Sequence, residues 1–180
     1  MHGKDASGQQ WKADKFMSTV FSKVKALSIV MNAVVLVSDF SFIQGGTGLT
    51  SLNWLSHKKN ELFSLITEKS AATLLSMNIR DSRLNNIRSL VFDRTGMPIV
   101  YPRLQTVEFS GGGDNDLSER FLVDKSTVPF PALRTLIWQS IYVFDDDTLF
   151  RGNGDTLESI CMDLDANLAR IQKKCNMFAA

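Results

Sequence analysis

An apolar triplet recurs along the chain, with two residues between its first and second members and one between its second and third. The first residues of successive copies lie 25, 25, 30, 29 and 24 positions apart. One such triplet arises easily by chance, but six at a nearly regular period indicate a repeat architecture, which decides the fold class before any other feature. The copies are Val24-Leu27-Ile29, Leu49-Leu52-Trp54, Leu74-Met77-Ile79, Leu104-Val107-Phe109, Leu133-Leu136-Trp138 and Leu157-Ile160-Met162.

The last two residues of each triplet are two apart, so they point to the same face of a short strand. We therefore expect the middle residues to share one buried column. They are Leu52, Met77, Val107, Leu136 and Ile160. A further triplet, Ile87-Leu90-Phe92, falls off the period and is assigned to a connection between two strands.

The segments between the strands carry helix signals in several places. Leu62, Leu65 and Ile66 share a helical face within residues 58–70. Similar spacing occurs in residues 16–24, and Asp165 is a candidate N-cap for an apolar stripe that follows the last strand. The repeating unit is thus a strand, a turn and a helix or loop. Such a repeat predicts an α/β solenoid in which each unit buries the apolar face of its neighbour.

This triplet and period resemble the leucine-rich repeat, in the ribonuclease-inhibitor-like form that F-box adaptors use. The resemblance implies a right-handed solenoid of about six repeats with a parallel, concave sheet. In the family, an Asn often lies three residues after the last residue of the triplet. This chain has an Asn at only one of the six corresponding positions, Asn32, and other residues, such as His57 and Ile141, at the rest. The segments 130–136 and 144–153 also resemble uncharacterised fungal repeat proteins, which implies this fold and a fungal origin and gives no information on chemistry. We assign residues 1–13 to a flexible tail and 14–180 to the solenoid.

Composition limits the classes of function. Twenty basic residues oppose nineteen acidic ones, for a net charge of +1, so no overall field favours nucleic acid or an anionic membrane. The longest apolar run, 26–37, is too short to span a bilayer. Two cysteines, Cys161 and Cys175, are too few for a disulfide framework, which favours a reducing cytoplasmic or nuclear location.

No constellation of catalytic residues is evident. His2 and His57 have no Cys or carboxylate at the spacing of metal ligands, and Cys161 has no His nearby in the sequence. Asp145-Asp146-Asp147 lacks the alternating ligands and central Gly of a calcium loop, so it is better explained as the start of a helix. We therefore expect a protein that is not an enzyme and that needs no metal or cofactor.

What remains is the face of the sheet opposite the core. Three columns of side chains project there. The first is uniformly small and is interpreted as close packing: Ala26, Ser51, Ser76, Thr106, Thr135 and Ser159. The second column is Ser28, Asn53, Asn78, Glu108, Ile137 and Cys161, and the third is Val30, Leu55, Arg80, Ser110, Gln139 and Asp163. These two mixed columns predict a binding face for a protein partner, and the resemblance adds the hypothesis of substrate recognition in a ubiquitin-ligase adaptor. Residues 1–23 lack the Leu-Pro opening of an F-box. The predicted partner-binding residues are Asn53, Asn78, Arg80, Glu108, Ile137 and Gln139.

Two alternative functions stay open at this point: a structural fragment of a larger repeat protein, and an enzyme of unknown type. The sixth strand is the last that the pattern provides before Ala180. An uncovered strand edge invites pairing, so we expect either a chain cut from a longer protein or self-association through this C-terminal edge.

Overall fold

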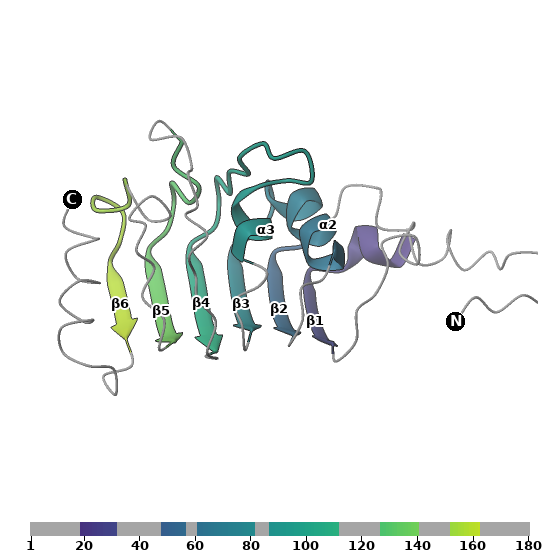
Figure 1. The fold of residues 1–180 in the computed structure, drawn as a ribbon, viewed down its shortest axis with the longest axis horizontal. Helices are drawn as coiled ribbons and strands as arrows, with labels where there is room; N and C mark the ends of the chain where they lie inside the picture. The colour runs from purple at the N-terminus through teal and green to yellow at the C-terminus, as the bar shows by residue number, and fades with distance from the viewer. Residues whose placement is uncertain are drawn as a thin grey trace, which may run out of the picture.

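In the part of the chain that the structure describes, six parallel strands form one sheet in which neighbours in space are neighbours in sequence (Figure 1). The computed structural model describes residues 19–31, 48–56, 61–81, 87–111, 127–140 and 152–162. The strands are β1 (Ala26–Met31), β2 (Ser51–Ser56), β3 (Ser76–Asp81), β4 (Thr106–Gly111), β5 (Thr135–Ser140) and β6 (Ser159–Met162). Because each strand pairs in parallel with the next, every connection returns to the same end of the sheet, which makes the chain a parallel solenoid.

The strand register follows the sequence repeat. Ser51 pairs with Ala26 and Ser76, and Thr135 pairs with Thr106 and Ser159. Consequently the second residue of each triplet lies beside the second residue of the next, and the same holds for the third. The predicted strands and their register are confirmed.

The turn into each of the strands β2 to β6 is built around one shared backbone carbonyl. The carbonyl oxygen of Lys25 accepts hydrogen bonds from two consecutive amides, those of Thr50 and Ser51. The same arrangement recurs at each later step of the sheet, with distances between 2.8 and 3.2 Å. The accepting residues are Lys25, Thr50, Leu75, Gln105 and Arg134. Each acceptor directly follows the first residue of a triplet, so this residue marks the entry into the strand.

Two helices, α2 (Glu61–Ser70) and α3 (Ile87–Val91), lie in the connections that flank β3 (Figure 1). The predicted helical face is confirmed, because Leu62, Leu65 and Ile66 are all buried. The off-period triplet that begins at Ile87 does lie in a connection, at α3. Residues 19–23 are also helical, whereas the described parts of the connections before β5 and β6 are turns.

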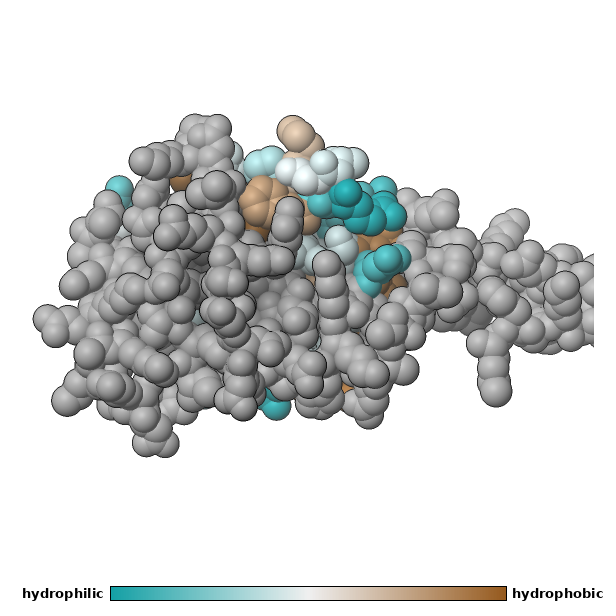
Figure 2. Space-filling model, in the orientation of Figure 1, coloured by the Kyte–Doolittle hydropathy of each residue, from teal (hydrophilic) through white to brown (hydrophobic). Residues whose placement is uncertain are grey.

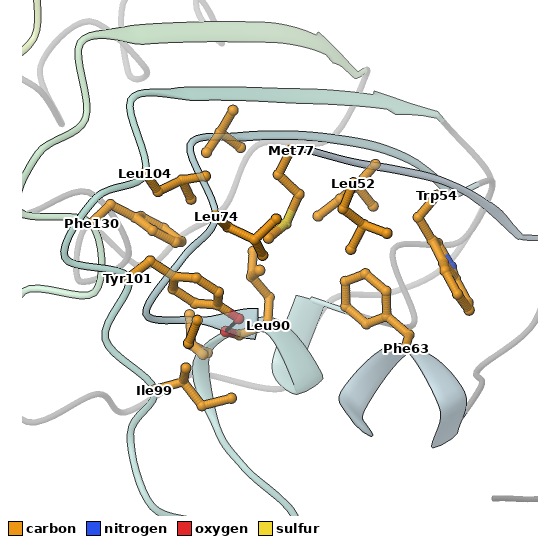
Figure 3. Packing of buried hydrophobic residues seen from close by; sticks show 14 of the residues in the cluster. Leu52, Trp54, Phe63, Leu74, Met77, Leu90, Ile99, Tyr101, Leu104 and Phe130 are labelled. Carbon is orange, nitrogen blue, oxygen red and sulfur yellow. Dashed lines mark hydrogen bonds between the residues drawn. The ribbon is translucent and has the colours of Figure 1, made fainter. Parts of the chain in front are cut away.

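The core lies on one side of the sheet. It combines three apolar columns, one for each triplet position, with apolar residues of the connections such as Phe63 and Tyr101 (Figure 3). Phe63 of α2 packs on Trp54, with ring centroids 5.1 Å apart, and Phe109 packs on Trp138 at 5.4 Å. Across β2–β5 all twelve triplet residues are buried. They are Leu49, Leu52, Trp54, Leu74, Met77, Ile79, Leu104, Val107, Phe109, Leu133, Leu136 and Trp138.

One member of the expected buried column departs from the prediction. Ile160 is 40% exposed, although its register partner Leu136 is fully buried. The reason is position in the sheet: among the described residues β6 is the last strand and has a strand neighbour on one side only. The column is therefore continuous from Leu52 to Leu136 and ends partly open at Ile160.

A second buried layer connects successive turns beneath the triplets. The Tyr101 hydroxyl donates to the Leu90 carbonyl at 2.8 Å, and its ring lies 5.6 Å from that of Phe130 (Figure 3). The Asn153 side-chain amide in turn donates to the Phe130 carbonyl. Side-chain contacts thus join the connections that precede β4, β5 and β6. The triplet pattern does not predict these contacts.

Burial gives Tyr101 a measurable effect at alkaline pH. Desolvation raises the pKa of its phenol above the ordinary value of 10.0, so the folded protein keeps it neutral while the unfolded chain ionises. Below about pH 10 the phenol is neutral in both states. Above that pH the wild type loses stability, by up to about 1.4 kcal/mol per pH unit.

We expect Tyr101→Phe to lower the free energy of unfolding by about 1–3 kcal/mol at pH 8, because the buried Leu90 carbonyl loses its donor. This difference should shrink in urea titrations between pH 10 and 11, since phenylalanine does not titrate. A difference that stays constant with pH would show that Tyr101 ionises equally in both states.

Candidate functional site

The face of the sheet opposite the core carries the side chains that alternate with the buried triplet positions, and we call it the open face. The register arranges these side chains in three columns, as the sequence predicts. Over the described strands the columns are Ala26, Ser51, Ser76, Thr106, Thr135 and Ser159; then Ser28, Asn53, Asn78, Glu108, Ile137 and Cys161; then Val30, Leu55, Arg80, Ser110 and Gln139. Asp163, which was assigned to the third column, lies outside the described residues.

The structure brings the six predicted partner-binding residues together on β2–β5. Asn53, Asn78, Glu108 and Ile137 are successive neighbours in the second column. Arg80 and Gln139 belong to the third column, with Ser110 between them. Asn53, Arg80 and Gln139 are exposed and the other three are half-buried, so all six form part of one accessible surface.

Hydrogen bonds between strands account for part of the polar composition of this face. The Ser76 hydroxyl donates to the Ser51 hydroxyl at 3.0 Å, within the first column. The Asn53 amide donates to the Ser28 hydroxyl at 3.1 Å, within the second. These side chains stabilise the sheet itself, which supports the interpretation of the first column as a close-packed, structural one.

A charged cluster occupies the centre of the open face. The Asn78 side-chain amide donates to one Glu108 carboxylate oxygen at 2.7 Å. The Arg80 guanidinium lies 3.9 Å from the other oxygen, at ion-pair distance but beyond a good hydrogen bond. The Glu108 side chain is 21% exposed and that of Arg80 is 56% exposed. Glu108 is therefore held by Asn78, while Arg80 projects into solvent.

The orientation of the Asn78 amide follows from its partner, because a carboxylate accepts only from the N–H side. Its carbonyl oxygen Oδ1 is then buried without a hydrogen-bond partner in the described structure. Sequence reasoning placed Asn78 and Glu108 side by side, but it gave no reason to expect a hydrogen bond between them.

A second exposed feature lies away from the strands, in the connection after α3. The Thr95 hydroxyl, together with backbone amides of the same turn, donates to the Asp93 carboxylate and lowers its pKa. At the end of this turn Met97 is 63% exposed. Figure 2 shows hydrophobic and hydrophilic residues intermixed near α2 and α3, so the described surface there is neither uniformly apolar nor uniformly polar.

The remaining candidates from the sequence do not gather into a site. Cys161 is an exposed free thiol on β6. His2, His57, Cys175 and residues 145–147 lie outside the described residues. Within the described ranges no group of three or more His, Cys, Asp or Glu side chains is placed to hold a metal ion. None of the described helices is long and apolar enough to cross a membrane.

Comparison of the chain with protein-family models, with curated proteins and with solved structures finds no significant match.

Proposed function

We propose that this chain is a protein–protein interaction module that binds a partner on its open face. The observation that carries the proposal is the cluster at the centre of that face, where Asn78 fixes Glu108 and leaves Arg80 projecting. The proposed contact residues are Asn53, Asn78, Arg80, Glu108, Ile137 and Gln139.

Backbone geometry supports recognition by side chains at this face. Each inner strand uses its amides and carbonyls in pairing with two neighbours, so its main chain has little left to offer a partner. The side chains of the open face project from a rigid support, with Arg80, Glu108 and the apolar Ile137 on three adjacent strands. A fixed array of mixed polarity suits recognition of one protein surface.

The finer assignment is a right-handed leucine-rich-repeat solenoid of six repeats, with the open face concave. The repeated triplets and the shared carbonyl before each strand support it. By analogy with that fold, a role in substrate recognition for a ubiquitin-ligase adaptor, in the cytoplasm or nucleus, follows as the sharper version of the proposal. It requires an F-box on the same polypeptide or on a bound partner.

Site-specific photocrosslinking tests the proposal. We expect benzoylphenylalanine at Gln139, on the open face, to give one defined adduct in an extract of the native cells. The same label at Met97, on the connection after α3, should not give that adduct, because Met97 is exposed but lies away from the strands. Mass spectrometry then identifies the partner.

A matched pair of charge reversals makes the test specific. Arg80→Glu should abolish the Gln139 adduct, whereas Arg94→Glu should retain it. Both arginines are exposed and paired with a glutamate, and Arg94 pairs with Glu68 of α2. An adduct obtained only from Met97 would move the binding surface to the turn around Asp93 and refute the proposal.

A further inference from the structure

One row of the open face combines apolar and cationic side chains in a fixed order. Register places Val30 of β1, Leu55 of β2 and Arg80 of β3 side by side in the third column. Val30 is 65% exposed, the largest exposed fraction among the large hydrophobic residues that the structure describes, and Leu55 is half-buried. We call these three residues the Arg80 row.

Arg80 is 56% exposed and keeps N–H donors for a ligand beyond its ion pair with Glu108. Glu108 accepts a hydrogen bond from Asn78 at 2.7 Å and meets Arg80 only at 3.9 Å. A guanidinium has five N–H donors, and Glu108 is the one polar contact that the structure gives Arg80 within the described residues. Arg80 is also the only cation among the described strand residues of the open face. The row therefore complements an apolar surface that carries one negative charge.

The spacing of the row indicates the conformation of that surface. Neighbouring strands lie about 4.8 Å apart, so the row spans about 9.6 Å from Val30 to Arg80. Side chains three or four residues apart on an α-helix are separated by about 5–6 Å, and the rise over seven residues is about 10.5 Å. In an extended segment, side chains on the same face are about 6.7 Å apart. This spacing does not match the distance of about 4.8 Å between neighbouring strands.

We infer that the open face binds an amphipathic helix of a protein partner, with a carboxylate side chain on Arg80 and apolar side chains on Leu55 and Val30. The helix lies across the strands, and the three residues recur at helical positions i, i+4 and i+7, or i, i+3 and i+7. This inference rests on the proposed function and adds the conformation and the chemistry of the partner's contact.

A displayed library of random 16-residue peptides, selected against the full chain, tests the inference. We expect the enriched peptides to share Asp or Glu, followed or preceded by large apolar residues at these helical spacings. Selection against Arg80→Glu should instead enrich Lys or Arg at the acidic position. Enrichment of alternating, strand-like motifs, of basic motifs on the wild type, or of no motif at all would overturn the inference.

A synthetic peptide of the enriched sequence, labelled for fluorescence anisotropy, supplies the quantitative test. Arg80→Glu should weaken its binding at least about tenfold, and replacing the peptide's acidic residue by Lys should restore binding to that variant. Val30→Asp should weaken binding without this rescue, and Arg94→Glu should leave it unchanged. Equal affinity for wild type and Arg80→Glu would contradict the contact.

The two proposals fail in distinguishable ways. If Gln139 crosslinks a partner but the peptides show no acidic, helical preference, the open face binds proteins by another mode and only the inference is lost. If Gln139 gives no specific adduct, the proposed function fails irrespective of the peptide result.

Discussion

Replacing Leu136 by alanine should lower the free energy of unfolding by about 2–5 kcal/mol. Leu136 is fully buried and lies between Val107 and Ile160 in the middle column of the core. Truncation removes three carbon atoms from a close-packed interior, and β5 cannot close the gap because its register is fixed on both sides. Chemical denaturation, with the midpoint and slope both measured, gives the value.

Two variants with different exposure serve as controls. Gln139→Ala, on the exposed face of the same strand, should change the free energy of unfolding by less than about 0.5 kcal/mol. Ile160→Ala should cost clearly less than Leu136→Ala, because Ile160 already keeps 40% of its surface exposed. Equal losses at Leu136 and Gln139 would contradict the strand register.

The second large effect is expected at Gly152, in the turn before β6. Its φ of 81° lies in the left-handed region, where a side chain costs about 1–2 kcal/mol. A Cβ at this position would also lie 2.9 Å from a methyl group of Val128, an overlap that adds about 1–3 kcal/mol. Gly152→Ala should therefore destabilise the fold by about 2–5 kcal/mol in a denaturant melt.

Gly96 provides a matched control, because it has nearly the same backbone conformation without the close neighbour. Its φ is 85°, and beyond Gly96 and its two chain neighbours no heavy atom of the described residues lies within 4 Å of a Cβ built there. Gly96→Ala should therefore cost only the conformational part, about 1–2 kcal/mol. If the two variants lose the same free energy of unfolding, the contact of a Cβ at position 152 with Val128 adds no destabilisation.

The strands and their register were predictable because two independent periodicities agree in the sequence. The two-residue spacing of Leu52 and Trp54 defines which face of a strand is buried, and recurrence of the triplet defines which residues pair. The helix around Leu62, Leu65 and Ile66 was predictable for the same reason, since burial of one face imposes a period.

The contacts between connections were not predictable from these periods. The connections differ in length, and Tyr101, Phe130 and Asn153 meet only after the strands have brought their turns together. Nor does a triplet show how well a terminal strand is covered. Ile160 therefore looks equivalent to Leu136 in sequence and differs from it in exposure.

For the candidate site, register predicted which side chains are neighbours but not how they interact. Asn78 and Glu108 had to lie side by side once β3 and β4 were aligned. Whether Glu108 bonds Asn78 or Arg80 depends on side-chain rotamers and on competition among three polar groups. That choice, 2.7 Å to Asn78 against 3.9 Å to Arg80, leaves the Arg80 side chain 56% exposed.

The shared carbonyl before each strand has a consequence for how such a chain can change over evolution. Each of the strands β2 to β6 is positioned by one acceptor on the preceding unit, and each of β2 to β5 is followed by a unit positioned in the same way. Duplication of one unit of 24–30 residues would create one new junction and leave all the other junctions as they were. The open face can therefore be lengthened by one strand without redesign of the existing core, whereas an insertion within an inner strand would break both of its junctions.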